Sequence, residues 1–386
     1  MGGLDPEERA AWISLSLVEG VGLLTFGRLV GHFGGAAPAL AAIRAGRLGP
    51  LAAELRLRHV VRAALVQAAA DPQSLQTPLR RLGLWTLTPL DERWPARLRG
   101  LADPPVTLHG WGEVASLEAV RAVAVVGTRR PTPAGRLLAS RLGDRLAEVG
   151  VVVVSGLAIG IDGAAHAAVV ARGGRTVAVI GAGHRAPGPR AHRRLMRDIV
   201  DSGGAVVSEL GPLAAATRGT YPRRNRILSG LADTVMVVEA PARSGAINTA
   251  HHALEQGRNL LVAPGRPGEV RTAGCLRLLR ETEARPLIGL DEALADAGID
   301  PRLALAPGPE ASPRRHAEPG QEGLGPAERA VAQRLGAGPA DLDQLVAATG
   351  LAPATVASAL GLLQLRGWAQ ASGATYLPAG PLLAGA

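Results

Sequence analysis

The sequence of 386 residues contains no lysine, and all 42 of its basic side chains are arginine. It therefore lacks the loop G-x-x-x-x-G-K-[ST] that cradles ATP phosphates, which disfavours ATP hydrolysis. The single cysteine, Cys275, has no partner for an internal disulfide, as is typical of a reducing compartment. No apolar run reaches the roughly 18 residues that a membrane span needs, and the acidic residues within 1–9 are untypical of a signal peptide. We therefore expect a soluble cytoplasmic protein without a membrane partner.

The chain as a whole is strongly basic. The net charge is +9 and the isoelectric point is about 11.1. Because arginine replaces lysine throughout and Ala, Gly and Pro are abundant, part of this basicity reflects general composition. The charge is compatible with an anionic partner but does not identify one.

Four regions differ in their residue patterns. Residues 1–80 carry apolar residues at helical spacing, and residues 81–300 alternate apolar runs with helical segments. Residues 301–322 have the Pro-rich and Gly-rich composition of a linker, and residues 323–386 return to a helical pattern. We predict a helical N-terminal domain, a central α/β domain, a linker and a C-terminal winged helix.

Continuous Val, Ile and Leu runs in the central region are typical of strands buried on both faces of a sheet. These runs are residues 122–126, 151–154, 176–180, 205–207, 234–238 and 259–262. The helical segments between them are residues 134–149, 162–172, 191–201, 223–231 and 246–256. The alternation predicts a Rossmann-like, doubly wound parallel sheet with right-handed crossovers. The Pro-rich passage that precedes it, at 85–111, is predicted to be an extended connection packed on this domain.

In the N-terminal region, a Gly-x-Gly turn at Gly20 and Gly22 separates helical stretches at 12–17 and 23–33. Such a turn resembles the helix-hairpin-helix unit of SAM-like domains, which can hold a DNA phosphate on backbone N–H groups. An ordinary turn between helices is the alternative interpretation.

The C-terminal region predicts three helices, at 326–335, 341–349 and 353–366, followed by a small hairpin. This is the pattern of a winged helix, whose third helix would be the recognition helix. Arg366 is the only charge in that helix, and phosphate contacts need cations. We therefore expect this domain to bind a partner or regulate the protein rather than to bind duplex DNA.

The expected strand ends are rich in glycine and serine. Glycine lets the backbone approach a ligand, and a following helix N-terminus favours an anion, so this edge of the sheet is predicted to bind phosphate. Gly156, Gly160 and Gly163 do not have the G-x-G-x-x-G spacing of a dinucleotide site. We therefore expect no cofactor.

One stretch combines an aromatic ring with three guanidinium groups within four residues: Tyr221-Pro222-Arg223-Arg224-Asn225-Arg226. Arginine supplies planar bidentate donors for phosphate, and tyrosine supplies a face on which a base can stack. The combination suits a polyanion with bases, although an arginine-rich solvated turn is the alternative. We predict that Arg129, Arg224 and Arg226 contact phosphates and that Tyr221 stacks on a base.

Other polar residues in the central region have ordinary structural uses. Asp162 is compatible with a helix cap, a ribose ligand or a catalytic acid, and capping is the commonest of these. His166, one turn later, is expected to make a supporting hydrogen bond. Glu239 ends a strand without an evident second carboxylate, so we expect it to have a structural or positioning role. The pair His251-His252 lacks metal-ligand spacing, so no metal site and no catalytic residue are predicted.

Taken in order, these motifs resemble those of the DprA/Smf family of DNA-processing proteins. The resemblance is close over residues 85–290, and the helical N-terminus and winged helix fit the family's architecture. The matching stretches are Ala124-Val125-Val126-Gly127-Thr128-Arg129, Val154-Ser155-Gly156-Leu157-Ala158-Ile159-Gly160-Ile161-Asp162, Ala165-His166, Ser208-Glu209, Tyr221-Pro222-Arg223-Arg224-Asn225-Arg226-Ile227-Leu228-Ser229-Gly230, Val237-Val238-Glu239-Ala240, Ser244-Gly245, Thr249-Ala250, Gly257-Arg258 and Ala263-Pro264-Gly265.

The resemblance implies a single-stranded DNA-binding recombination mediator and not an enzyme. Members of the family protect incoming DNA during natural transformation, load the RecA recombinase and displace single-strand binding protein. The resemblance also implies a homodimer and a DNA pocket on the Rossmann-like domain. With Arg223 added from the arginine cluster, the residues expected at that pocket are Arg129, Ser155, Gly156, Tyr221, Arg223, Arg224, Asn225, Arg226, Ser244 and Gly245.

Two stretches depart from the family pattern. Residues 186–192 stand where the family has an aromatic-Pro-x-x-Asn element, and residues 272–276 stand where it has Ser-x-Gly-x-Asn. The alternative function is that of a nucleotide-binding enzyme, similar to nucleoside monophosphate hydrolases of the same Rossmann-like superfamily. That group has Pro-Gly-Gly-x-Gly-Thr where this chain has Pro241-Ala242-Arg243-Ser244-Gly245-Ala246, and the missing glycine pair favours binding over chemistry.

The late part of the Rossmann-like region, residues 254–287, is the expected self-association surface. Leu276, Leu278 and Leu279 cover more than one face of a helix, so part of this apolar surface is left for a partner. We predict a two-fold homodimer built near this segment.

Overall fold

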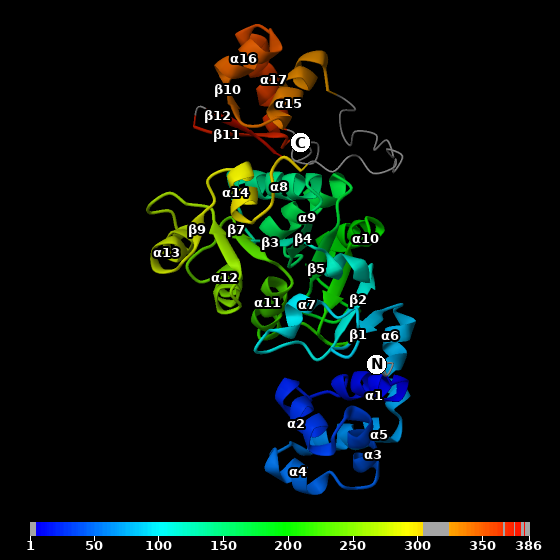
Figure 1. The fold of residues 1–386 in the computed structure, drawn as a ribbon. Helices are drawn as coiled ribbons and strands as arrows, with labels where there is room; N and C mark the ends of the chain where they lie inside the picture. The colour runs from blue at the N-terminus through cyan, green and yellow to red at the C-terminus, as the bar shows by residue number, and fades with distance from the viewer. Residues whose placement is uncertain (1–4, 304–323, 366, 374, 380–381, 383–386) are drawn as a thin grey trace.

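The computed structural model describes residues 5–303, 324–365, 367–373, 375–379 and 382. They form three successive bodies: a helical N-terminal domain, a central α/β domain and a winged helix, with the central domain in the middle (Figure 1). Most of the predicted linker, 304–322, lies outside the described residues.

The N-terminal domain is built from short helices around its own apolar core. They are α1 (Pro6–Ser16), α2 (Leu23–Phe33), α3 (Ala36–Arg44), α4 (Gly49–Glu54), α5 (His59–Ala70) and α6 (Pro72–Arg81). The turn before α2 needs glycine, because Gly20 has φ +85° and a Cβ there would lie 2.7 Å from Val61. Arg9 of α1 donates to Asp91 at 2.7 Å and so joins this domain to the central one.

The central domain contains a nine-stranded sheet in the order β1-β2-β6-β5-β4-β3-β7-β8-β9. The strands are β1 (Trp85–Leu87), β2 (Leu108–Gly112), β3 (Ala122–Val126), β4 (Val152–Ser155), β5 (Thr176–Val179), β6 (Ala205–Ser208), β7 (Thr234–Val237), β8 (Asn259–Val262) and β9 (Arg285–Pro286). All six predicted strands are present, and β6-β5-β4-β3-β7-β8 are parallel to one another. The predicted parallel core is therefore confirmed.

The prediction of a merely extended connection at 85–111 is wrong in part. β1 and β2 pair with each other and β2 pairs with β6, both antiparallel, so the passage widens the sheet. The Trp85 ring packs where a side chain at position 110 would lie, since a Cβ on Gly110 would be 2.3 Å from that ring. Neither strand exceeds five residues, and prolines separate them, so their sequence signal is weak.

Helices cover both faces of the sheet, as a doubly wound fold requires. α8, α9, α10 and α14 pack on one face, and α7, α11, α12 and α13 pack on the other. The helical elements are α7 (Ala96–Arg99), η1 (Val114–Glu118), α8 (Pro133–Glu148), α9 (Ile161–Ala171), η2 (Arg190–His192), α10 (Arg193–Asp201), α11 (Thr220–Gly230), α12 (Gly245–Glu255), α13 (Ala273–Glu281) and α14 (Leu290–Asp296). The strand order reverses between the adjacent strands β3 and β7. In doubly wound folds such a switch point places a ligand-binding crevice at the carboxyl ends of the neighbouring strands.

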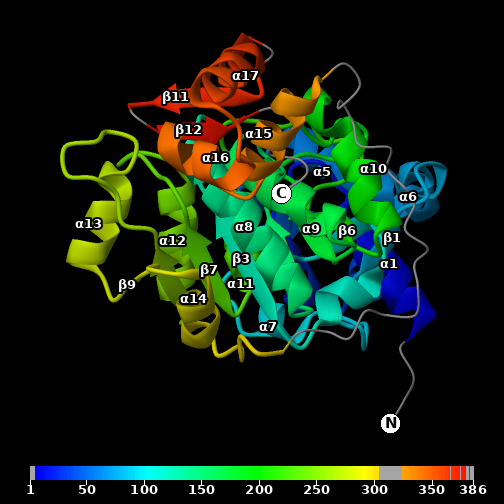
Figure 2. The same cartoon turned by 90° about the horizontal axis from the view of Figure 1, so that it is seen from above.

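The predicted winged helix has a third, two-residue strand that the sequence did not indicate. Its elements are α15 (Pro326–Gly336), β10 (Ala340–Asp341), α16 (Leu342–Thr349), α17 (Pro353–Leu365), β11 (Ala369–Ser372) and β12 (Thr375–Pro378). Gly350 ends α16 with φ +66°, a left-handed conformation that favours glycine. The domain lies over α8 (Figure 2), where Arg141 donates to the carbonyl oxygen of Ala337 at 3.0 Å.

No single helix of the described residues has both the length and the apolar composition of a membrane span. α16 and α17 satisfy that test only when taken together, as a pair bent by 111°.

Candidate nucleic-acid interface

A cavity of about 360 Å³ opens at the carboxyl edge of β3, β4 and β5, beside the first turn of α11. Four of the predicted site residues line it, namely Arg129, Gly156, Tyr221 and Arg224. The other lining residues are Leu157, Ala158, Ile159, Ile180, Gly181, Pro187, Gly188 and Pro189. The structure thus brings together one part of the predicted set, from the loops after β3 and β4 and from α11.

Arg224 is the most unusual group in this cavity. Its side chain is buried, and within the described part of the chain its Nε and Nη1 atoms have no hydrogen-bond partner. Burial lowers the pKa of Arg224, and the charge of Asp162 only partly opposes this effect. A buried cation with unused donors is costly unless an anion reaches it. Arg224 is therefore placed to bind an anionic group that enters the cavity.

The loop after β4 makes room for this guanidinium. A Cβ at Gly156 would lie 2.0 Å from the Nη1 atom of Arg224, so any larger residue there would displace the guanidinium. The next residue, Leu157, has φ +56°, which is uncommon for a residue other than glycine, and its side chain is anchored in the core. The sharp turn points the Gly156 N–H toward Asp162, whose Oδ2 accepts it at 3.2 Å.

Asp162 does not cap α9, contrary to the interpretation that we preferred from sequence. The helix begins at Ile161 with Gly160 as its N-cap. Asp162 instead stabilises the Gly156 loop by accepting its backbone N–H. Burial raises the pKa of Asp162, while Arg224 and backbone N–H groups act in the opposite direction. His166 donates or accepts a supporting hydrogen bond at 2.7 Å with the Thr176 hydroxyl, as expected.

Tyr221 and Arg129 lie at the entrance of the cavity. Tyr221 belongs to the first turn of α11, so the stretch that contains it is helical and not a solvated turn. Tyr221 remains 37% exposed, and the guanidinium carbon of Arg129 lies 5.3 Å from the centroid of its ring. That distance is within the range of a cation–π interaction. The exposed ring and the adjacent cation offer a base and a phosphate neighbouring contacts.

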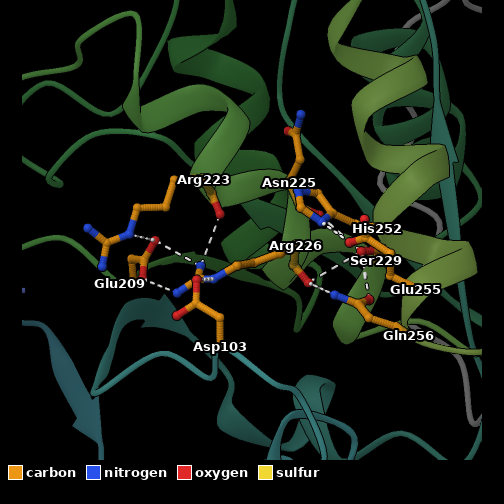
Figure 3. Close-up of polar contacts among 9 residues, drawn as sticks. All are labelled: Asp103, Glu209, Arg223, Asn225, Arg226, Ser229, His252, Glu255 and Gln256. Atoms are coloured by element: carbon orange, nitrogen blue, oxygen red, sulfur yellow. Dashed lines mark hydrogen bonds and ion pairs between the residues drawn. The ribbon is translucent and has the colours of Figure 1, made fainter. Parts of the chain in front are cut away.

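Arg226, predicted to contact phosphate, is placed differently (Figure 3). Its side chain is buried, and it donates to Glu209 at 2.7 and 3.0 Å and to Asp103 at 2.9 Å. Arg223 also lies near Glu209, at 3.5 Å, but its side chain is 44% exposed. Because carboxylates already neutralise Arg226, we revise its predicted role from phosphate contact to structural ion pair.

Three further predicted residues connect elements and do not line the cavity. Asn225 donates its amide to the Gly245 carbonyl at 3.1 Å, and so joins α11 to α12. Ser244 caps α12 by accepting the N–H of Ile247 at 3.4 Å. Ser155 is fully buried and donates to the Val125 carbonyl at 2.6 Å. These residues position the edge of the sheet, which is a supporting role.

The carboxylate of Glu239 also has hydrogen-bond partners within the protein. It accepts the backbone N–H of Thr132 at 2.9 Å and the hydroxyl of the same residue. It thereby joins the end of β7 to the start of α8 across the point where the strand order reverses. This geometry agrees with the structural role expected for it.

Several cavity residues carried no chemical signal of their own in the sequence, although Leu157 and Ile159 lie within a stretch that matches the family. Leu157, Ile159 and Ile180 are apolar, and nothing in their spacing sets them apart from core residues. Pro187-Gly188-Pro189 lies within the stretch that departs from the family pattern, and that departure was the only sign that it borders a site.

Comparisons with known proteins agree with the fold and the edge just described. The family model described as DNA recombination-mediator protein A matches residues 85–298. The models of the DprA-like N-terminal HHH domain and the DprA winged helix domain match residues 6–57 and 315–373. All three parts of the chain therefore match one family, and the helix-hairpin-helix interpretation of the N-terminal turn is confirmed over the ordinary turn.

Curated relatives extend over nearly the whole chain. The putative DNA processing protein DprA of Mycobacterium tuberculosis (strain H37Rv) is 35% identical over 386 residues, covering 95% of this chain and 93% of its own. Protein Smf of Synechocystis is 30% identical over 385 residues, covering 93% of this chain and 95% of its own.

Two solved structures are also similar. The X-ray structure of DNA processing protein A from Streptococcus pneumoniae has a TM-score of 0.61 at 29% identity, covering 75% of this chain and 98% of that one. DNA processing protein A from Helicobacter pylori, described for its unique single-stranded DNA binding mode, has a TM-score of 0.50 at 28% identity, covering 55% and 94%. By its family models and its full-length relatives, this chain belongs to the DNA recombination-mediator protein A (DprA/Smf) family.

Proposed function

We propose that this chain binds single-stranded DNA at the Arg224 cavity and acts as a recombination mediator rather than as an enzyme. The observation that carries the proposal is the buried guanidinium of Arg224, which lacks a hydrogen-bond partner in the described part of the chain and lies beside the exposed ring of Tyr221. The described binding of single-stranded DNA by the Helicobacter pylori relative supports it.

In this proposal, Arg224 binds a phosphate inside the cavity and the Tyr221 ring stacks on a neighbouring base. Arginine suits the phosphate because its planar donors can bind two oxygens at once. Stacking on an aromatic ring tolerates every base, so the site would bind strands with little sequence preference. Arg129, at the entrance, would contact a second phosphate.

The alternative, a nucleotide hydrolase, has less support. No Asp or Glu is among the described residues that line the cavity. The nearby carboxylate of Asp162 is buried and accepts the Gly156 N–H, so it is not placed as a general acid or base for a bound nucleotide. Glu239, the carboxylate at the end of β7, already accepts a hydrogen bond from the backbone N–H of Thr132. Binding without chemistry accounts for these observations.

A paired experiment tests this proposal. Fluorescence anisotropy with a labelled oligonucleotide, repeated at several salt concentrations, should show tight binding whose logarithm falls linearly with the logarithm of salt concentration. Nucleoside monophosphates incubated with the same protein should remain intact by chromatography. Hydrolysis above a heat-inactivated control, or no strand binding at low salt, would refute the assignment.

The further roles of loading RecA, displacing single-strand binding protein and acting in natural transformation rest on family membership. We propose that the protein speeds assembly of RecA on a strand already coated with single-strand binding protein. RecA ATPase activity on such a strand should rise on addition of the protein. An unchanged lag and rate would remove the mediator role while leaving strand binding intact.

We also propose a homodimer built near α13. Leu278 is buried and Leu279 packs partly on the sheet core, whereas Leu276 is only partly buried and lines a second cavity of about 660 Å³. Leu276→Glu is therefore the better test than a change at Leu279, which would disturb the fold. Light scattering should report a dimer for the original protein and a monomer for the variant, and a monomer for both would remove the dimer.

A further inference from the structure

Five exposed arginines lie within the thirteen residues from 185 to 197, a stretch that includes part of the cavity lining. We call them the arginine track: Arg185, Arg190, Arg193, Arg194 and Arg197. They lie in the loop after β5, in η2 and in the first turns of α10, which packs beside α9 (Figure 2). The whole chain has 42 basic residues in 386, so the track is a local concentration of charge.

The track is electrostatically unfavourable where it stands. α10 begins with two arginines and has no acidic residue in its first turn, and His192 provides no side-chain cap. Cations near a helix N-terminus are repelled by the partial positive charge of the helix dipole. Met196 and Ile199, which are buried on the opposite side of the helix, hold it on the sheet despite this repulsion.

The track is also left largely without carboxylates. In the described part of the chain, its only ion pair joins Arg194 to Asp198 at 3.9 Å, and Arg194 remains 82% exposed. Two surface arginines elsewhere provide a contrast, because each is closely paired: Arg93 with Glu118 at 2.9 Å and Arg172 with Asp144 at 2.6 Å. The charges of the track are therefore left largely available to an anionic partner.

The track is continuous with the cavity. Pro187, Gly188 and Pro189, which line the cavity, lie between Arg185 and Arg190 in sequence. The Nδ1 atom of His192 lies 3.0 Å from the carbonyl oxygen of Leu157, so η2 is held directly against the cavity loop. An anionic chain that leaves the cavity on this side therefore meets the track next.

We propose that the arginine track binds the phosphate backbone of the strand beyond the nucleotides held in the cavity. This inference rests on the proposed function of the cavity and extends it to a second set of phosphate contacts. Arg193 and Arg197 are one helical turn apart on the same side of α10, which lets them contact neighbouring phosphates. The track has no exposed large apolar side chain in the described structure, so it lacks the anchor typical of a protein interface.

The test compares two double variants that lose the same charge. Arg193→Gln/Arg197→Gln changes the track, and Arg93→Gln/Arg172→Gln is the matched control on paired surface arginines. Removing cations from the start of α10 leaves the melting temperature unchanged or raises it, which thermal unfolding checks. Strand affinity is then measured against salt with an oligonucleotide of about 4 nucleotides and one of about 16, which bracket the usual site sizes.

We expect the track variant to lower the salt slope on the long oligonucleotide by about 1.4, or about 0.7 for each lost phosphate contact. Binding of the short oligonucleotide should not change, and the control variant should match the original protein on both. An unchanged slope on the long strand, an equal loss on both strands, or an equal loss in the control overturns the inference. Failure of the original protein to bind any strand would instead refute the cavity's proposed function.

A competition arm distinguishes nucleic acid from an acidic protein partner. A polyglutamate peptide of matching charge should displace the long strand only weakly, and equally from the original protein and the track variant. If the peptide binds the original protein more tightly than the strand does, and the track variant loses that binding, the track recognises acidic protein and the proposal is overturned.

Discussion

Arg224 and Arg226 lie two residues apart on α11, and both are buried, yet they stand in opposite surroundings. Successive residues of an α-helix are rotated by about 100°, so these two side chains point to nearly opposite sides of α11. One enters the cavity beneath the Gly156 loop with unused donors. The other meets Glu209 and Asp103 and forms hydrogen bonds with both. The same residue type therefore does two different jobs within one turn.

The difference shows that the hydrogen-bond partners of a buried arginine indicate whether it stabilises the fold or binds a ligand. A buried arginine whose donors are satisfied by carboxylates joins parts of the protein, and its loss leaves an uncompensated anion behind. A buried arginine without partners weakens the fold slightly and is retained at a cost that a ligand can offset. Four measurements test this contrast, beginning with the largest expected effect.

Arg226→Ala should lower the free energy of unfolding by about 3–5 kcal/mol, because Glu209 would be left buried without its main partner. The nearby Arg223 should keep the loss at the lower end of this range. Urea unfolding measures it, and Arg226→Met/Glu209→Leu, which removes both charges, should recover most of the stability. If Arg226→Ala instead keeps its stability and loses strand affinity, Arg226 is a DNA ligand and the contrast fails.

Arg224→Met should have the reverse outcome. Removing a desolvated cation relieves its burial cost but also removes its attraction to Asp162, so the free energy of unfolding should change little. Strand affinity, by contrast, should fall by at least about 2 kcal/mol. Anisotropy titration beside urea unfolding separates the two effects. A clear loss of stability with unchanged affinity would show that Arg224 serves the fold.

Tyr221→Ala should weaken strand binding by about 1–3 kcal/mol through lost stacking, and Tyr221→Phe should bind almost as well as the original protein. The ring is partly exposed, so neither change should lower the melting temperature greatly. Equal loss in the Phe and Ala variants would mean that the hydroxyl, not the ring face, makes the contact.

At neutral pH the smallest effect comes from three buried histidines. Burial lowers the pKa of His109 and His166 to about 3 and that of His184 to about 4. These values lie below the unfolded value of about 6.5. Their contribution to stability is therefore complete above pH 6.5 and is lost as the pH falls toward 4 for His184 and toward 3 for His109 and His166.

The loss should be about 1.4 kcal/mol per pH unit for each histidine over this range. The charge of Arg224 helps to hold His166 neutral, so it belongs to the cavity region, whereas His109 lies on β2. His166→Gln should reduce the slope of stability against pH between 6 and 4 by about one histidine's share. A slope identical to that of the original protein would place His166 outside the titrating set.

The sequence alone determined most of the architecture. β3 and β8 have the predicted bounds, because unbroken apolar runs are needed only where both faces of a strand are covered. The winged helix was recognisable from its helical spacing and from Gly350. The weak strands β1, β2, β9 and β10 were missed, because two to five residues carry too little periodicity and become strands only by pairing with a neighbour.

For the candidate site, the sequence predicted fewer of the residue roles than it did for the fold. The sequence located Tyr221 and Arg224, because a ring and several guanidiniums in one short stretch are a local signal. It could not separate Arg224 from Arg226, since the latter's partners lie 17 and 123 residues away and reach it only in the folded chain. Whether a buried charge is neutralised or left free depends on which carboxylates the fold brings within hydrogen-bonding distance, and only the tertiary structure decides that.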